Sequence, residues 1–142
     1  MVFIDYLHEI EALKNEISVK EEKIAGLRAI AEGIKPVRYD GMPGGAKDGS
    51  FMEEALVKAA DLENEVKEKK TVLARKKMFL LDVFEKMDDR ILSSILSFRY
   101  INGFSVKQIA NRMHYTTRWI YKALQSAYIQ AEEEMRKFDE FP

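Results

Sequence analysis

Residues 90–131 read RILSSILSFRYINGFSVKQIANRMHYTTRWIYKALQSAYIQA, and the spacing of apolar residues in this stretch decides the fold. Ser105 is placed to cap a short helix over residues 106–113. After a turn of three residues, Thr116 is placed to cap a longer helix over residues 117–134. Two helices joined by so short a turn form a helix-turn-helix unit, whose second helix enters the major groove of DNA.

A further helix is predicted to precede this pair over residues 90–102. Either Asp88 or Asp89 can cap its start, and Gly103 can end it in a left-handed conformation. Within the pair, Ala110 fits the place where the first helix approaches the second closely, since a larger side chain there would force the helices apart. The stretch therefore predicts a compact domain over residues 88–142.

The charge of this stretch differs from that of the whole chain. The chain has a net charge of −1, yet residues 90–131 contain six basic residues and no Asp or Glu. The six are Arg90, Arg99, Lys107, Arg112, Arg118 and Lys122. Local positive charge of this kind is what DNA binding uses, because basic side chains replace the counterions of the phosphates.

The helix over residues 117–134 is predicted to be two-sided. Its inward residues are Ile120, Leu124, Ala127 and, further along, Ile129 and Ala131. Its opposite side carries types suited to phosphates and base edges. The candidate DNA-binding residues are Ser105, Lys107, Arg112, Thr116, Thr117, Arg118, Tyr121, Lys122 and Gln125.

The aromatic residues near the turn are interpreted as packing residues. Trp119 is expected to pack back on the first helix of the pair, because tryptophan is usually largely buried, with a partner surface as the alternative. Tyr115 and Tyr128 are expected at the edge of the core. His114 is interpreted as a turn residue or a phosphate contact.

The first 87 residues predict a charged helical hairpin. Apolar residues recur every three or four positions in two stripes, interrupted by lysines. The first stripe comprises Phe3, Tyr6, Ile10, Leu13, Ile17, Lys20, Ile24, Leu27, Ala31 and Ile34. The second comprises Met52, Ala55, Ala59, Leu62, Val66, Lys69, Leu73, Lys76, Leu80, Val83 and Met87. The stripes can pack within one chain or against a second copy, and the small core of two helices favours a homodimer.

Residues 33–50 separate the two stripes and hold five of the seven glycines and two of the three prolines. This composition predicts a loop, and Ser50 with Glu53 fits a capping box that starts the second helix near Phe51. The overall prediction is an all-α chain with a long, coiled-coil-like hairpin over residues 1–87 that supplies oligomerisation, followed by the helix-turn-helix domain.

The stretch 90–131 resembles the fourth-region helix-turn-helix of bacterial sigma factors. The resemblance lies in RYINGFS (99–105), the Ile109-Ala110 pair, MHYT (113–116) and IYKALQSA (120–127). The whole chain, including IKPVRYDGMPGG (34–45), looks like ArpU- or RinA-like late transcriptional regulators encoded by phages and prophages of Gram-positive bacteria. It departs from the sigma-like pattern at Gln108, where Glu is usual, and at Trp119, where a small or polar residue is.

The resemblance implies control of phage late or packaging genes in the cytoplasm of a bacterial host, by promoter DNA binding with possible contact to RNA polymerase. It places DNA-contacting side chains at Thr117, Arg118, Tyr121 and Lys122. Two rival functions remain. One is a small terminase-like packaging subunit, which would assemble into a ring. The other is a helical module that binds RNA polymerase or a sigma factor without reading DNA.

The composition argues against an enzyme and against a membrane protein. The chain has two histidines and no cysteine, and its glycine cluster lacks the spacing of a phosphate-binding loop, so neither metal nor cofactor is expected. Residues 1–10 lack the pattern of a secretion signal, and no apolar run approaches the ~20 residues of a membrane span. These features predict a cytoplasmic protein with no membrane partner.

Overall fold

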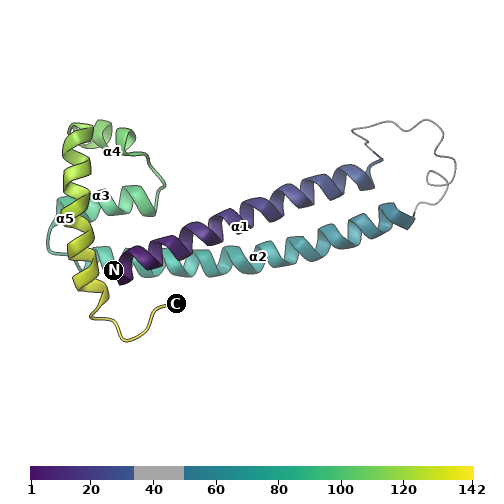
Figure 1. Ribbon diagram of the computed structural model, residues 1–142, viewed down its shortest axis with the longest axis horizontal. Helices are drawn as coiled ribbons and strands as arrows, with labels where there is room; N and C mark the ends of the chain where they lie inside the picture. Colours follow the sequence, from purple (N-terminus) through teal and green to yellow (C-terminus); the bar gives the residue numbers. More distant parts are fainter. Residues whose placement is uncertain (34–49) are drawn as a thin grey trace. The chain divides into compact units, whose positions relative to one another are not determined.

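The computed structural model describes residues 1–33 and 50–142, and all regular structure in these residues is helical (Figure 1). The five helices are α1 (Val2–Ala31), α2 (Ser50–Glu85), α3 (Arg90–Tyr100), α4 (Val106–Met113) and α5 (Thr117–Met135). The predicted all-α class, with a helical hairpin before a helix-turn-helix domain, is confirmed. None of these helices is both long and apolar enough to cross a membrane.

The predicted helix ends agree closely with the observed ones. Helix α4 has the predicted bounds, α5 is one residue longer, and α2 begins at Ser50, one residue before the expected start. Of the loop predicted over residues 33–50, residues 34–49 lie outside the described part of the chain. Asp89, rather than Asp88, caps α3, since its Oδ1 accepts hydrogen bonds of 3.0 Å from the N–H groups of both Ile91 and Leu92.

Helix α3 ends two residues earlier than predicted. Gly103 has φ +75°, a left-handed conformation that glycine adopts without a steric penalty. The chain reversal lets the N–H of Phe104 donate to the carbonyl of Phe98 at 2.9 Å, which satisfies an acceptor at the helix end. The prediction that the helix stops by Asn102-Gly103 was correct. The last turn of α3 is shorter than predicted because the chain reverses to form the hydrogen bond between Phe104 and Phe98.

The chain divides by packing into two compact units. The core unit comprises Met1–Glu11 together with Val72–Pro142, and the hairpin unit is Ala12–Thr71. The predicted division fell after residue 87, whereas the packing divides both long helices. The reason is that Phe3, Tyr6 and Ile10 belong to the same buried cluster as the end of α2 and the helices α3 to α5.

In the hairpin unit the two predicted stripes face each other within one chain. Ile17, Ala55, Ala59 and Val66 are buried along this seam. The lysines that interrupt the stripes find carboxylates on the opposite helix: Lys20 Nζ lies 3.4 Å from Glu65 Oε2, and Lys69 Nζ lies 3.0 Å from Glu16 Oε1. A slipped pairing of the two helices would leave these partly buried ammonium groups against apolar side chains. The two ion pairs therefore favour a single register of the hairpin.

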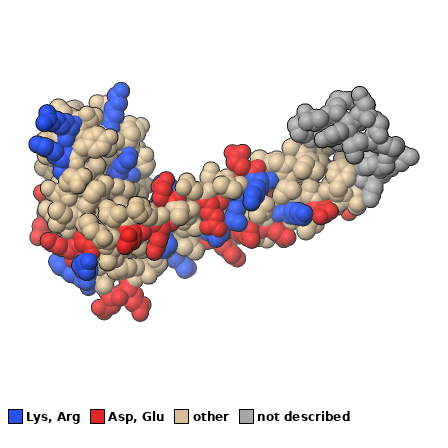
Figure 2. All heavy atoms as spheres, viewed as in Figure 1, with Lys and Arg blue, Asp and Glu red and all other residues tan. Residues whose placement is uncertain are grey.

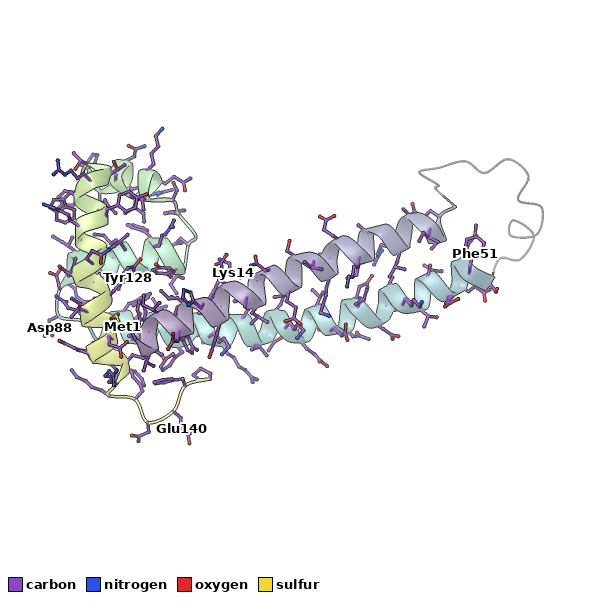
Figure 3. The ribbon with its side chains drawn as sticks, viewed as in Figure 1. Met1, Lys14, Phe51, Asp88, Tyr128 and Glu140 are labelled. Carbon is purple, nitrogen blue, oxygen red and sulfur yellow. The ribbon has the colours of Figure 1, made fainter. Side chains whose placement is uncertain are left out.

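The core unit is built around aromatic rings from four helices. The Phe3 ring is completely buried and lies 6.0–6.4 Å, centroid to centroid, from the rings of Phe84, Tyr100 and Tyr128. The hydroxyl groups of Tyr100 and Tyr128 form a hydrogen bond of 2.6 Å, so each partly buried phenol has a partner. Tyr128, on α5, is labelled in Figure 3. Burial and this hydrogen bond raise the pKa of Tyr100, which keeps this phenol neutral.

A buried carboxylate joins α5 to the beginning of α1 in the same unit. Glu132 is only 8% exposed, and its Oε1 accepts a hydrogen bond of 2.8 Å from the backbone N–H of Phe3. Its Oε2 lies 2.6 Å from Nε of Arg136. Burial favours the protonated acid, but the Phe3 hydrogen bond and the Arg136 charge outweigh it and lower the pKa of Glu132.

Candidate nucleic-acid interface

The start of α4 is held by a reciprocal pair of hydrogen bonds. The N–H of Gln108 donates to Oγ of Ser105 at 3.2 Å, and the N–H of Ser105 donates to Oε1 of Gln108 at 2.8 Å. This is a capping box, in which glutamine does what glutamate does elsewhere. The departure at Gln108 from the sigma-like pattern is therefore structurally neutral at this position.

The turn between α4 and α5 depends on one left-handed residue. His114 has φ 61° and ψ 40°, and the N–H of Tyr115 donates to the carbonyl of Ala110 at 3.0 Å. Glycine or asparagine usually takes this conformation at a helix end. Thr116 then starts α5, because its Oγ1 accepts a hydrogen bond of 3.1 Å from the N–H of Trp119. The interpretation of His114 as a turn residue and of Thr116 as a cap is confirmed.

The inner face of α5 packs as expected over most of its length. Ile120, Leu124 and Ala127 are buried in one cluster with Ile109 and Ala110 of α4. The small side chain of Ala110 thus stands in the core that both helices of the pair share. The face runs on through Ala131.

Ile129 was expected on this face but is 58% exposed, so that expectation was wrong. It stands two residues from both Ala127 and Ala131, which places it about 200° around the helix from each. The buried positions at the end of α5 are instead Ala131, Glu132 and Met135.

The nine candidate DNA-binding residues are all exposed. Five of them share the outer face of α5: Thr117, Arg118, Tyr121, Lys122 and Gln125. The hydroxyls of Ser105 and Thr116 accept helix-capping hydrogen bonds, and each still has its own O–H group to donate. The structure brings the α5 residues together, and contact with DNA stays a prediction.

The six basic residues of this stretch fall into two groups. Arg90 donates to the carbonyl of Glu85 at 3.2 Å, and Arg99 donates to that of Phe104 at 3.1 Å. The guanidinium of Arg112 lies over the ring of Phe104, 4.4 Å from its centroid. These three arginines support the fold.

The other three basic residues, Lys107, Arg118 and Lys122, form no hydrogen bond or ion pair with the described residues. They are therefore free to meet a ligand. Lys and Arg side chains gather over α4 and the start of α5 in the space-filling view (Figure 2). Charge alone could not separate the two groups of basic residues, because the distinction depends on tertiary contacts.

Trp119 does not pack back on α4, and its predicted burial was wrong. Its ring is 37% exposed and lies parallel to the ring of Tyr115, with centroids 3.9 Å apart and an angle of 14° between planes. Tyr115 has the same exposed fraction, so it is a surface residue rather than a core-edge one. The spacing of four residues between the two aromatic side chains was the signal that could have suggested this stack.

The described residues contain no group of His, Asp or Glu side chains that could hold a metal ion. The candidate interface therefore consists of exposed hydrogen-bonding, cationic and aromatic side chains, which are held in place by the packing of α3, α4 and α5. Comparison of the chain with models of protein families, with curated proteins and with solved structures gives no match.

Proposed function

We propose that the protein is a sequence-specific DNA-binding regulator of transcription that reads the major groove with α5. The observation that carries this proposal is the two-sided α5. Ile120, Leu124 and Ala127 anchor it in the core, while Arg118 and Lys122 stand on its exposed side and form no hydrogen bond or ion pair with residues 1–33 and 50–142.

The dimensions of α5 fit the proposal. The residues from Thr117 to Gln125 span about 12 Å along the helix axis, and the major groove is ~12 Å wide. Arg118 and Gln125 are suited to guanine and adenine edges respectively, and Lys107 on α4 is suited to a phosphate. The stacked Tyr115 and the Thr116 cap fix the start of α5, so that Thr117 and Arg118 extend from a rigid turn.

The resemblance to ArpU- and RinA-like regulators supports a narrower role. Under this proposal the protein acts in a bacterial host cell on phage late or packaging genes, binds DNA as a homodimer, and contacts RNA polymerase at the promoter. The hairpin is the expected site of dimerisation, through side chains other than the two stripes that already pack against each other within one chain.

The experiment is a selection of bound duplexes from a randomised DNA pool, followed by mobility shifts at two salt concentrations. The proposal expects an enriched sequence whose complex resists unrelated competitor DNA and weakens as salt rises. Arg118→Ala should cost ~1–3 kcal/mol of binding free energy and relax specificity at one base pair. An equal loss on every sequence would make Arg118 a phosphate contact.

A matched control tests whether DNA binding depends on the cations of α4 and α5 in particular, rather than on any two positive charges. The variant K107A/K122A removes two of the free cations, whereas R75A/K77A removes two cations of α2. The first should weaken binding at least tenfold and the second should leave it nearly unchanged. Equal losses in the two variants, or a selection that enriches no sequence, would overturn the proposal.

The exposed Tyr115–Trp119 stack favours a second candidate function. A helical module that binds RNA polymerase or a sigma factor without reading DNA would use such an aromatic surface, because aromatic residues are enriched at protein interfaces. Under this alternative, Arg118→Ala and K107A/K122A would leave function intact.

A further inference from the structure

A groove runs along α5 beside the start of α3, and its first part has apolar walls. Trp119 lines this part, and Leu92 and Ala123, both buried, form its apolar walls. The polar side chains that also border it are those of Asp89, Lys122, Ser126 and Gln130. The indole of Trp119 is 37% exposed and lies beside apolar side chains. Tryptophan in such a position is typical of a residue that anchors a partner at an interface.

The second part of the groove is acidic. It is lined by Asp88 and Glu133 above the buried side chain of Met87, and again by Asp89 and Gln130. Asp89 and Gln130 border both hollows, so the two adjoin and are taken together as one groove. This groove has apolar walls at the Trp119 end and carboxylates at the other.

The carboxylates in the second part are not equivalent. Asp89 caps α3, and Glu134 Oε1 lies 2.9 Å from Nζ of Lys137, so these two already have partners. Asp88 and Glu133 are exposed and form no hydrogen bond or ion pair with the described residues, and the cation that they act on is Lys137, whose pKa is raised first by Glu134 and then by these two charges. Their charges are available to a cationic ligand, and they disfavour the DNA backbone as the occupant of this end.

The length of the groove indicates the size of the occupant. Trp119 and Glu133 are 14 residues apart on α5, a rise of about 21 Å, or about four helical turns. Grooves between two helices commonly receive the apolar side of a third helix.

We propose that this groove binds an amphipathic helix of a partner protein. The apolar side chains of that helix would lie against Trp119, and its Lys or Arg side chains would face Asp88 and Glu133. The proposal does not depend on DNA binding, because its test follows Trp119 and the carboxylates of Asp88 and Glu133. Lys122 is the one candidate DNA-binding residue that also borders the groove.

The test uses Trp119 as the reporter, because it is the only tryptophan of the chain. The probe is a 15-residue amphipathic helix of Leu and Lys without aromatic residues, titrated into the full-length protein while Trp119 emission is followed. We expect a saturable shift of the emission to shorter wavelength. The same peptide with Glu in place of Lys, or with Ser in place of Leu, should bind at least tenfold more weakly.

Two charge-reversal variants separate the groove from general electrostatics. D88K/E133K should weaken the Leu/Lys peptide at least tenfold, while D139K/E140K, with the same change of net charge outside the groove, should change it less than twofold. Circular dichroism establishes that both variants keep their helices. An unchanged emission, equal weakening by the two variants, or equal binding of the Glu peptide would overturn the proposal.

Discussion

The carboxylate of Glu132 acts as a cap for α1 through the 2.8 Å hydrogen bond from the N–H of Phe3, a residue 129 positions earlier in the chain. The first four N–H groups of a helix have no partner within it. A negative charge at that end also interacts favourably with the helix dipole. Glu132 thus fixes the end of α5 to the start of α1 within the core unit.

Replacing Glu132 should destabilise the protein. Glu132→Ala leaves the Phe3 N–H without its acceptor in a buried place, which is expected to lower the free energy of unfolding by ~1–3 kcal/mol. Urea unfolding followed by circular dichroism measures the change. The matched control is Glu133→Ala, an exposed neighbour, which should change stability by less than ~0.5 kcal/mol. Similar losses in both variants would contradict the capping role.

The stability that Glu132 contributes should depend on pH in a definite direction. Its pKa in the folded protein is lower than its ordinary value of 4.5, so the folded state favours the ionised form. The contribution is therefore fully present above pH ~4.5 and is lost as the pH falls through the lower, folded-state pKa. The stability difference between the wild type and Glu132→Gln should shrink over this acidic range. A difference that grows on acidification would show that the assignment is wrong.

The left-handed turn predicts an order of stability at residue 114. Glycine adopts φ 61° freely, while a β-branched residue does not. His114→Gly should be as stable as the wild type or more so, and His114→Val should be less stable by ~1–3 kcal/mol. Thermal unfolding of the three proteins tests this order. Equal stability of the Val and Gly variants would mean that the turn has another conformation in solution.

The shared core of α4 and α5 predicts sensitivity at Ala110. Ala110→Leu adds three carbon atoms to a position that is 3% exposed, which should cost ~1–3 kcal/mol of stability and displace α5. Ala74→Leu makes the same addition at an exposed site of α2 and serves as the control. DNA mobility shifts should weaken for the first variant only. Unchanged stability of Ala110→Leu would show that the two helices are not closely packed there.

The sequence predicted the helices and the face of each that is buried, because helical periodicity and capping residues are local signals. Ser105, Thr116 and Gly103 act as local chemistry dictates. Periodicity could not tell which element covers a face, and Trp119 shows the consequence: it meets Tyr115, four residues earlier, instead of α4.

Glu132 marks a second limit of the sequence. In the printed order it belongs to a run of three glutamates, and only the tertiary contact with Phe3 distinguishes it from its neighbours. The division of the long helices into two units was missed for the same reason, since Phe3, Tyr6 and Ile10 continue the stripe of the hairpin without any change of pattern.

The composition of the core unit from two distant segments has a consequence for how the chain folds. Met1–Glu11 is synthesised first, but its partners lie in Val72–Pro142. The hairpin unit joins segments closer in sequence, and its contacts can form while the ribosome is still at work. The aromatic start of α1 has to wait for α5 to emerge, so α5 closes a loop that runs from Phe3 to Glu132. The core is therefore completed in the same folding step that packs α5 into place.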